Sequence, residues 1–320
     1  MKILVTGGAG FIGSHVVDLY IDKGYKVWVV DDLSTGKREN LNPECTFFQM
    51  DIRSEMLRDI IKEIRPDIIN HHAAQISVPD SVKDPIGDAD INIKGLLNIL
   101  EQSVRYKVKK IIFISSGGAI YGEVDDIPVS EARPPKPLSP YAISKFVSEY
   151  YLSFYRHHYG LDYTVLRYSN IYGPRQIPKG EAGVVAIFIN NLLNQRVSVL
   201  NHFPDDEEGM IRDYCFVEDV AEANLCALTM GSGQSYNIGS GIGTKTLHLY
   251  RVIYRTVKEL IPDLSEELYE PKREGARPGD IPKNCLLIEK ARTELGWLPK
   301  TSLENGIQKT IRWWIDRYNR

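Results

Sequence analysis

The first half of the chain alternates short apolar runs with longer amphipathic segments. The apolar runs are continuous, which is typical of strands that are buried on both faces of a parallel sheet. We predict six strands, at residues 2–6, 26–30, 46–49, 68–71, 110–115 and 163–167. Amphipathic stretches at residues 12–23, 54–64 and 88–105 lie between them and predict helices. This order predicts an α/β fold with a doubly wound parallel sheet of the Rossmann type over residues 1–169.

The pattern changes after Ser169. Short strands, loops rich in Pro and Gly, and helices at residues 184–195, 247–260 and 303–318 follow, with an acidic loop at residues 204–209. We therefore expect residues 170–320 to form a smaller α/β domain against the carboxyl edge of the sheet. Some of its later segments are expected to return to the first domain.

Composition narrows the classes of function. The net charge is −3 and no long run of one sign occurs, which disfavours a nucleic-acid surface. The four cysteines lie far apart and form no Cys-x-x-Cys pair, which argues against a zinc site or a disulfide scaffold and fits a reducing cytosol. The apolar runs are too short to span a membrane, and the first strand leaves no room for a signal peptide. We expect a cytoplasmic protein without a metal.

A glycine-rich segment follows the first strand directly. Gly7-Gly8-Ala9-Gly10-Phe11-Ile12-Gly13 contains Gly-x-Gly-x-x-Gly between a predicted strand and a predicted helix. Such glycines permit a tight turn, close approach of the backbone to a pyrophosphate, and close packing of helix on strand. Asp31 and Asp32 end the second strand, where a carboxylate accepts hydrogen bonds from ribose and repels a 2′-phosphate. The sequence therefore predicts NAD rather than NADP. A second glycine cluster, at residues 231–243, is predicted to form turns.

The Tyr-x-x-x-Lys spacing occurs three times, at Tyr106/Lys110, Tyr141/Lys145 and Tyr254/Lys258. This spacing places both side chains on one helical face, where the lysine favours the phenolate and lowers the tyrosine pKa from ~10 towards neutrality. The middle copy begins a helix that Ser139 can cap and in which Pro140 suits the first position. Its sheet edge also carries Ser115 and Ser116, either of which could supply a hydroxyl. We expect Tyr106/Lys110 to span a helix end and a strand start at the opposite edge, and Tyr254/Lys258 to be a surface pair.

Further motifs accompany this Ser/Tyr/Lys group. They lie at residues 3–15, 30–34, 72–75, 121–122, 140–145, 166–175 and 212–214. Together they resemble the extended short-chain dehydrogenases and reductases, the NAD-dependent epimerase/dehydratase family, over essentially the whole chain. Within that family they most resemble bacterial and archaeal UDP-glucose 4-epimerases.

The resemblance implies a nucleotide-sugar 4-epimerase. Tyr141 would take the proton of the sugar's 4-hydroxyl while hydride leaves C4 for NAD, and hydride would return to the opposite face of the 4-keto sugar. Lys145 would lower the tyrosine pKa and hold the nicotinamide ribose, and Ser116 would bond the same sugar oxygen. The resemblance also implies a homodimer formed through the helices at residues 88–105 and 141–157.

Two further sets of residues carry roles that the resemblance implies. The cofactor positions are Gly7, Gly10, Phe11, Ile12, Gly13, Asp31, Asp32, Leu33, Ser34, Thr35, Gly36, Asp51, Ile52, Ala73, Ala74, Gln75, Asn92, Tyr141, Lys145 and Tyr168. The substrate positions are Ser116, Asn170, Val184, Leu200, Arg212, Arg277 and Asp280. Residues 170–320 would thus bind a UDP-hexose.

Some positions depart from the family pattern and leave alternatives open. The serine loop is one residue longer than the common form, so Ser115 and Ser116 compete for the catalytic role. Leu200 stands where an aromatic residue often packs on uracil, and Asn284 replaces a bulky tyrosine, so an N-acetyl group would be admitted. An epimerase of UDP-N-acetylhexosamine or of a UDP-uronate is the main alternative. A dehydratase is disfavoured because residues 117–120 carry no carboxylate. The intact Ser/Tyr/Lys set argues against a non-catalytic NAD sensor.

Overall fold

Seven parallel strands form the main sheet of the protein. The structure is a computed structural model that describes residues 1–178, 183–277 and 279–318. The strand order is β10-β6-β5-β4-β1-β2-β3, and all the pairings are parallel. The strands are β1 (Lys2–Thr6), β2 (Lys26–Asp31), β3 (Thr46–Gln49), β4 (Ile68–His71), β5 (Lys110–Ser116), β6 (Asp162–Tyr168) and β10 (Gln234–Ile238). The six predicted strands are confirmed, and β10 joins them from the last third of the chain.

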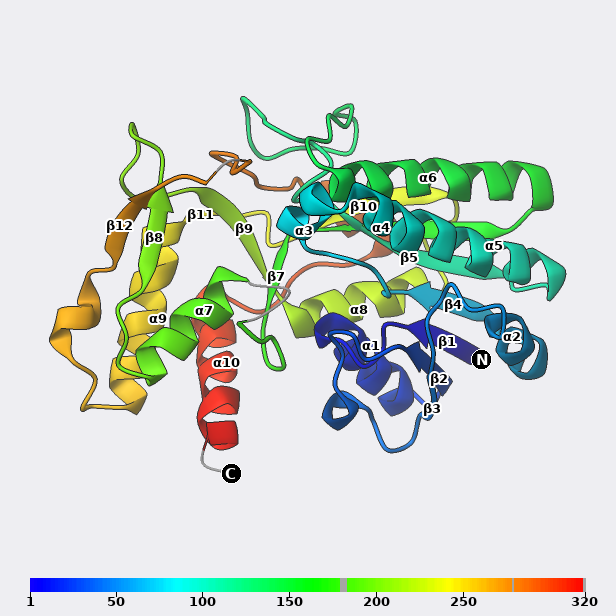
Figure 1. The fold of residues 1–320 in the computed structure, drawn as a ribbon, viewed down its shortest axis with the longest axis horizontal. Coiled ribbons are helices and arrows are strands. Elements are labelled where there is room, and N and C mark those ends of the chain that lie inside the picture. The colour runs from blue at the N-terminus through cyan, green and yellow to red at the C-terminus, as the bar shows by residue number, and fades with distance from the viewer. Residues whose placement is uncertain (179–182, 278, 319–320) are drawn as a thin grey trace.

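Helices cover both faces of this sheet (Figure 1). On one face α1 (Phe11–Asp22) packs against α8 (Val217–Ala227). On the other lie α2 (Leu57–Ile64), α5 (Gly95–Arg105) and α6 (Pro140–Tyr159). Along β1, Ile3 and Val5 face the α1–α8 core and Leu4 faces the α2–α5–α6 core. Because both faces are buried, the strand is apolar throughout, and this is why a continuous run predicted it.

The remaining elements form a smaller layer beyond one end of the main sheet (Figure 1). It contains two small sheets, one of β7 (Asn170–Tyr172), β9 (Ile211–Phe216) and β11 (Gly243–Lys245), the other of β8 (Val199–His202) and β12 (Lys272–Gly275). The helices α7 (Val184–Leu193), α9 (Thr246–Leu260) and α10 (Leu303–Tyr318) surround a separate apolar core. Phe188 and Tyr250, fully buried and stacked edge to face, lie at its centre.

The helix predicted at residues 88–105 is divided. Two short helices, α3 (Val78–Lys83) and α4 (Pro85–Ala89), lead into a π-helical turn at Asp90–Lys94, and α5 continues from it. Such turns occur frequently at functional sites. The start of α6 follows the prediction, since the hydroxyl of Ser139 accepts the N–H of Ala142 and Pro140 occupies the first turn. Both features bear on the site, because they lie at the carboxyl edge of the sheet.

Candidate functional site

The loop after β1 turns tightly against the sheet before α1 begins. Gly7 has a left-handed backbone (φ +72°), and a Cβ there would lie 2.5 Å from the backbone nitrogen of Ala73. A Cβ on Gly13 would lie 2.2 Å from the Gly7 carbonyl oxygen, so only glycine allows α1 to pack this closely. Over residues 10–23, all of which the structure describes, no side chain caps α1, and no acidic residue lies in its first turn. The N–H groups of the helix start are therefore open to a pyrophosphate, which fits NAD.

Asp31 lies beside this loop at the end of β2. Its carboxylate is 6% exposed and accepts the N–H groups of Ala9 at 3.0 Å and Leu33 at 2.8 Å. Burial raises the pKa of Asp31, and the two N–H donors oppose that rise. Asp32, by contrast, is exposed and accepts both the N–H and the hydroxyl of Ser34. Asp31 is thus the acid that lies against the glycine loop, whereas Asp32 stabilises its own turn.

The other predicted cofactor positions follow the ends of β3, β4 and β6. Asp51 is paired with Arg53, which holds the pKa of that carboxyl below its usual value. After β4, the N–H of Gln75 donates to Asn92 Oδ1, and Asn92 Nδ2 donates to the Gln75 carbonyl, both at 2.9 Å. Tyr168 ends β6 and is 4% exposed. These positions converge because the carboxyl ends of parallel strands share one edge.

The end of β5 distinguishes the two candidate serines. Ser115 is buried, and its hydroxyl donates to Glu149 at 2.6 Å. Glu149 also receives two hydrogen bonds from Arg167, at 3.1 Å and 2.6 Å. Ser116 lies on the opposite side of the strand, because successive strand residues alternate. Among the described residues no group forms a hydrogen bond with the Ser116 hydroxyl, so this hydroxyl remains available to a substrate.

Tyr141 and Lys145 lie together at the start of α6. Lys145 is 4% exposed, its ammonium donates to the Ile114 carbonyl at 2.9 Å, and it lies 5.9 Å from the centre of the Tyr141 ring. The ring of Phe113 covers the same ammonium at 5.1 Å. Burial lowers the Lys145 pKa to about 8, and the charge of Asp88 opposes this. The site thus holds a phenol next to a partly desolvated ammonium, at the edge that also bears the glycine loop.

The predicted substrate positions belong mainly to the smaller layer. Arg212 on β9 is the most informative, because burial lowers the pKa of its guanidinium and no carboxylate pairs with it among the described residues. Its only recorded hydrogen bond there goes to the Ile211 carbonyl at 2.9 Å. Asn170 is exposed on β7, and Val184 is half-buried at the start of α7. A half-buried guanidinium that has no ion-pair partner among the described residues fits an anionic ligand such as a diphosphate.

The three other predicted positions differ in how well they fit a substrate site. Arg277 is exposed and forms a turn with Asp280, whose carboxylate accepts the Arg277 N–H at 2.9 Å. Leu200 is fully buried in β8, with no exposed surface to offer a base. The arrangement therefore does not support Leu200 as a substrate contact.

The two other Tyr-x-x-x-Lys copies lie away from this edge. Tyr106 follows α5 and Lys110 begins β5, as predicted. The prediction of a surface pair at Tyr254/Lys258 is wrong. Tyr254 is only 6% exposed, its hydroxyl donates to the Ser265 carbonyl, and Lys258 donates to the Leu264 carbonyl. These two side chains stabilise the loop after α9 through hydrogen bonds and do not form a solvent-exposed pair.

Comparison with known proteins identifies the family to which the chain belongs. The model of the NAD dependent epimerase/dehydratase family matches residues 3–239. The chain is 41% identical over 323 residues to the UDP-glucose 4-epimerase of Mycolicibacterium smegmatis, with 99% of each covered. The chain belongs to the NAD-dependent epimerase/dehydratase family.

Two solved structures of the family are similar to this one. A UDP-glucose 4-epimerase of Thermotoga maritima with UDP-glucose has 48% identity and a TM-score of 0.92, covering 99% of this chain and 100% of that chain. A UDP-glucose 4-epimerase of Thermus thermophilus in complex with NAD has 43% identity and a TM-score of 0.89, covering 98% and 99%. The likeness therefore extends over both the main sheet and the smaller layer.

Buried carboxylates that the sequence patterns did not single out hold this family member's site together. Glu149 lies one turn beyond Lys145 on α6 and joins Ser115 to Arg167, as described above. Asp213, next to Arg212, is fully buried and accepts the N–H and hydroxyl of Ser240, each at 2.6 Å. Both side chains act across long sequence separations, so only their nearness to predicted site residues could have suggested them. Asp88 is a third such carboxylate.

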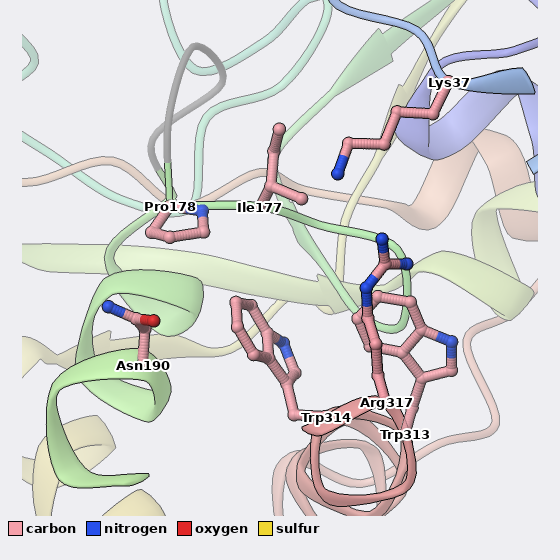
Figure 2. A pocket seen from close by; sticks show the side chains of 7 residues that line it. All are labelled: Lys37, Ile177, Pro178, Asn190, Trp313, Trp314 and Arg317. Atoms are coloured by element: carbon pink, nitrogen blue, oxygen red, sulfur yellow. The ribbon is translucent and has the colours of Figure 1, made fainter. Parts of the chain in front are cut away.

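A cavity of about 360 Å³ lies between the segment around Lys37 and helix α10 (Figure 2). Its lining comprises Lys37, Ile177, Pro178, Asn190, Trp313, Trp314 and Arg317. Figure 2 shows the Lys37 ammonium and the Arg317 guanidinium near one another above the tryptophan rings. Both cations pair with the single carboxylate of Glu39.

Further findings bear on the class of protein. In the described parts of the chain no helix has the length and apolar character needed to cross a bilayer. Those parts also contain no cluster of three residues suited to hold a metal ion. All four cysteines are free thiols.

Proposed function

We propose that this chain is an NAD-dependent UDP-glucose 4-epimerase, which interconverts UDP-glucose and UDP-galactose. The observation that carries the proposal is the Tyr141 phenol above the buried Lys145 ammonium, at the sheet edge that bears the glycine loop and Asp31. The family match and the likeness to the Thermotoga and Thermus epimerases support it over the full chain. NAD fits the site because Gly7 and Gly13 allow the tight turn and the close packing of α1 that bring the uncapped N-terminus of this helix to the sheet edge.

In the proposed reaction, Tyr141 removes the proton of the 4-hydroxyl and later returns a proton to the same oxygen. The Lys145 charge favours the phenolate form that accepts the proton. Ser116 bonds the sugar oxygen with the hydroxyl that the Glu149 network does not use. NAD, when bound, supplies the redox chemistry at C4. The protein's own groups thus move one proton out and one back, and the net change is inversion at C4.

The nucleotide part of the substrate is assigned to the smaller layer. We propose that Arg212 and Arg277 bind the diphosphate and that Asn170, Val184 and Asp280 line the rest of this region. The half-buried guanidinium of Arg212, which has no ion-pair partner in the parts of the chain that the structure describes, supports this assignment. The division into a cofactor domain over residues 1–169 and a nucleotide-sugar domain over residues 170–320 is part of the proposal, with α8 and β10 packed on the first domain.

A UDP-N-acetylhexosamine is the second candidate substrate, favoured by Asn284. This side chain is 1% exposed, and its Nδ2 donates to the Gly117 carbonyl at 3.1 Å beside the serine loop. Its Oδ1 has no hydrogen-bond partner among the described residues. An asparagine is smaller than the tyrosine that restricts the sugar pocket of some epimerases, and this smaller side chain supports a substrate with an N-acetyl group.

We further propose a homodimer in the cytoplasm. Large apolar side chains are exposed along neighbouring helices: Val82 on α3, Ile86 on α4, and Ile143, Tyr150 and Phe154 on α6. An exposed apolar patch of this kind suits a second copy of the chain. The free thiols suit a reducing compartment. Sedimentation should give a dimer for the wild type and a monomer for Phe154→Glu; a monomeric wild type would contradict the proposal.

A panel of sugar nucleotides tests the proposed function directly. UDP-glucose, UDP-galactose, their N-acetyl counterparts, UDP-uronates, and dTDP- and GDP-hexoses would each be incubated with the purified protein, and C4 inversion followed by NMR. We expect inversion of UDP-glucose and UDP-galactose. NAD, not NADP, should be released on denaturation. A protein that retains NAD but inverts none of these sugars would overturn the proposal.

A further inference from the structure

Asp88, in α4, is a buried carboxylate bonded only to neutral donors in the described parts of the chain. It is 1% exposed. One oxygen accepts the Ser144 hydroxyl at 2.5 Å, and the other accepts Gln75 Nε2 at 2.9 Å and Asn92 Nδ2 at 3.0 Å. A carboxylate taken out of water is costly unless its oxygens are hydrogen-bonded. Neutral donors meet this need here without neutralising the charge.

The three donors come from segments that surround the catalytic edge. Ser144 directly precedes Lys145 on α6, Gln75 follows β4, and Asn92 lies in the π-helical turn. Gln75 and Asn92 are also bonded to each other. Asp88 therefore joins the helix that carries Lys145 to two segments predicted to contact NAD.

The charge of Asp88 also acts on Lys145. The Lys145 ammonium is buried, donates to a backbone carbonyl, and has no carboxylate hydrogen-bonded to it in the described residues. Burial lowers the Lys145 pKa to about 8, and Asp88 raises it. A nearby charge of opposite sign commonly shifts a pKa by ~1–3 units.

The other ionisable groups around Lys145 are either paired with other side chains or held in their neutral form. On α6, Tyr141 faces the ammonium, and Glu149 is paired with Arg167. From the β4 side, burial lowers the pKa of His72 to about 3 and that of His71 well below its usual value. In the π-helical turn, Asp90 is paired with Arg53 and Lys94. Asp88 is thus the carboxylate positioned to affect the proton on Lys145.

We propose that Asp88 is a positioning residue for the epimerase reaction: its buried negative charge keeps the Lys145 ammonium protonated beneath Tyr141, and its hydrogen bonds hold Ser144, Gln75 and Asn92 in place. The proposal rests on the proposed function. Loss of the charge lets the ammonium release its proton at lower pH, and activity then falls earlier on the alkaline side.

The test compares pH profiles of kcat, from about pH 6 to 10, for the NAD-loaded wild type and four variants. Asp88→Asn removes the charge and keeps nearly the same shape, and Asp88→Ser is a smaller neutral variant in case the amide does not fold. Asp88→Glu retains the charge. Ser144→Ala removes one hydrogen bond to Asp88 while leaving its carboxylate, and is the matched structural control.

We expect the alkaline limb of Asp88→Asn to move down by about one pH unit, which gives about tenfold lower kcat near pH 9 relative to wild type. Asp88→Glu should restore much of the wild-type limb, and Ser144→Ala should retain it. An unmoved limb in a folded neutral variant would overturn the role of Asp88. So would an equal shift in Ser144→Ala, or failure of both neutral variants to fold while Ser144→Ala folds, because each indicates a purely structural function. An inactive wild type would instead refute the proposed function.

Discussion

Helices α6 and α9 each carry a Tyr-x-x-x-Lys pair, yet the two pairs have different surroundings. On α6, the Lys145 ammonium is buried beside the Tyr141 and Phe113 rings at the carboxyl edge of the main sheet. On α9, Tyr254 and Lys258 both donate to backbone carbonyls of the loop that follows the helix. The same spacing therefore places a phenol beside a buried ammonium on α6, where we propose catalysis, and two hydrogen bonds to a neighbouring loop on α9.

The difference teaches that helical spacing determines which side chains share a face but not what that face meets. The face of α6 contacts the end of β5, where Lys145 meets the Ile114 carbonyl and the Phe113 ring. The corresponding face of α9 contacts the loop that follows the same helix. Four experiments test whether the two pairs differ in function as their surroundings indicate.

The largest expected effect is that of removing the phenolic hydroxyl on α6. Tyr141→Phe should lower kcat by at least ~10²-fold, as for the loss of a general acid/base, while leaving bound NAD and thermal stability nearly unchanged. Coupled assay of UDP-galactose conversion would measure this. Tyr254→Phe is the matched control and should retain wild-type turnover. Unchanged turnover in Tyr141→Phe would refute the assignment.

The next effect concerns the alkaline side of the pH profile. Because burial lowers the Lys145 pKa to about 8, activity that needs the ammonium should fall about tenfold per pH unit above that value. The sign for stability is opposite. In the unfolded chain the pKa of this lysine is ~10.5, so below about pH 8 the buried ammonium lowers the free energy of unfolding. This unfavourable contribution disappears as pH rises from about 8 to ~10.5. A rate that stays constant to pH 10 would show that Lys145 does not contribute in this way.

A smaller effect is expected on the acid side, from the histidines beside α6. The His72 pKa is about 3 in the folded protein because burial, and secondarily Lys145, disfavour its charged form. In the unfolded chain this histidine binds a proton near pH 6.5. The free energy of unfolding should therefore fall as pH drops below that value, by up to ~1.4 kcal/mol per pH unit for this group. Urea titrations at several pH values would measure it, and His72→Leu should flatten the slope. An equal slope in that variant would assign the effect elsewhere.

The smallest effect should come from the α9 pair. Tyr254→Phe removes the hydrogen bond to the Ser265 carbonyl and should reduce the free energy of unfolding by about 1 kcal/mol. Denaturant unfolding would detect the change, with Tyr159→Phe on the exposed end of α6 as a control for hydroxyl loss. A loss of catalysis without loss of stability in Tyr254→Phe would contradict the contrast between the two helices.

Much of the fold could be predicted because its signals are local. Each of the first six strands is a short apolar run, and Ser139 and Pro140 mark the start of α6. Strand β10 was not assigned to the main sheet, because Tyr236, Asn237 and Ile238 pair with β6 across a separation that no local pattern encodes. The π-helical turn before α5 was also missed, since its sequence continues an ordinary amphipathic pattern.

By itself, the sequence determined the glycine loop, the acid at the end of β2 and the candidate Tyr141/Lys145 pair, since a strand, a turn and a helix are short-range structures with residue preferences of their own. Only the tertiary structure distinguished Ser115 from Ser116 and showed that Leu200 is fully buried. It also left the Arg212 guanidinium without an ion-pair partner among the described residues and bonded Asp88 to Ser144, the residue before Lys145. Those outcomes depend on which distant side chains share a desolvated volume. Burial and charge act through space, so the properties of each group follow from neighbours that the chain supplies only once it is folded.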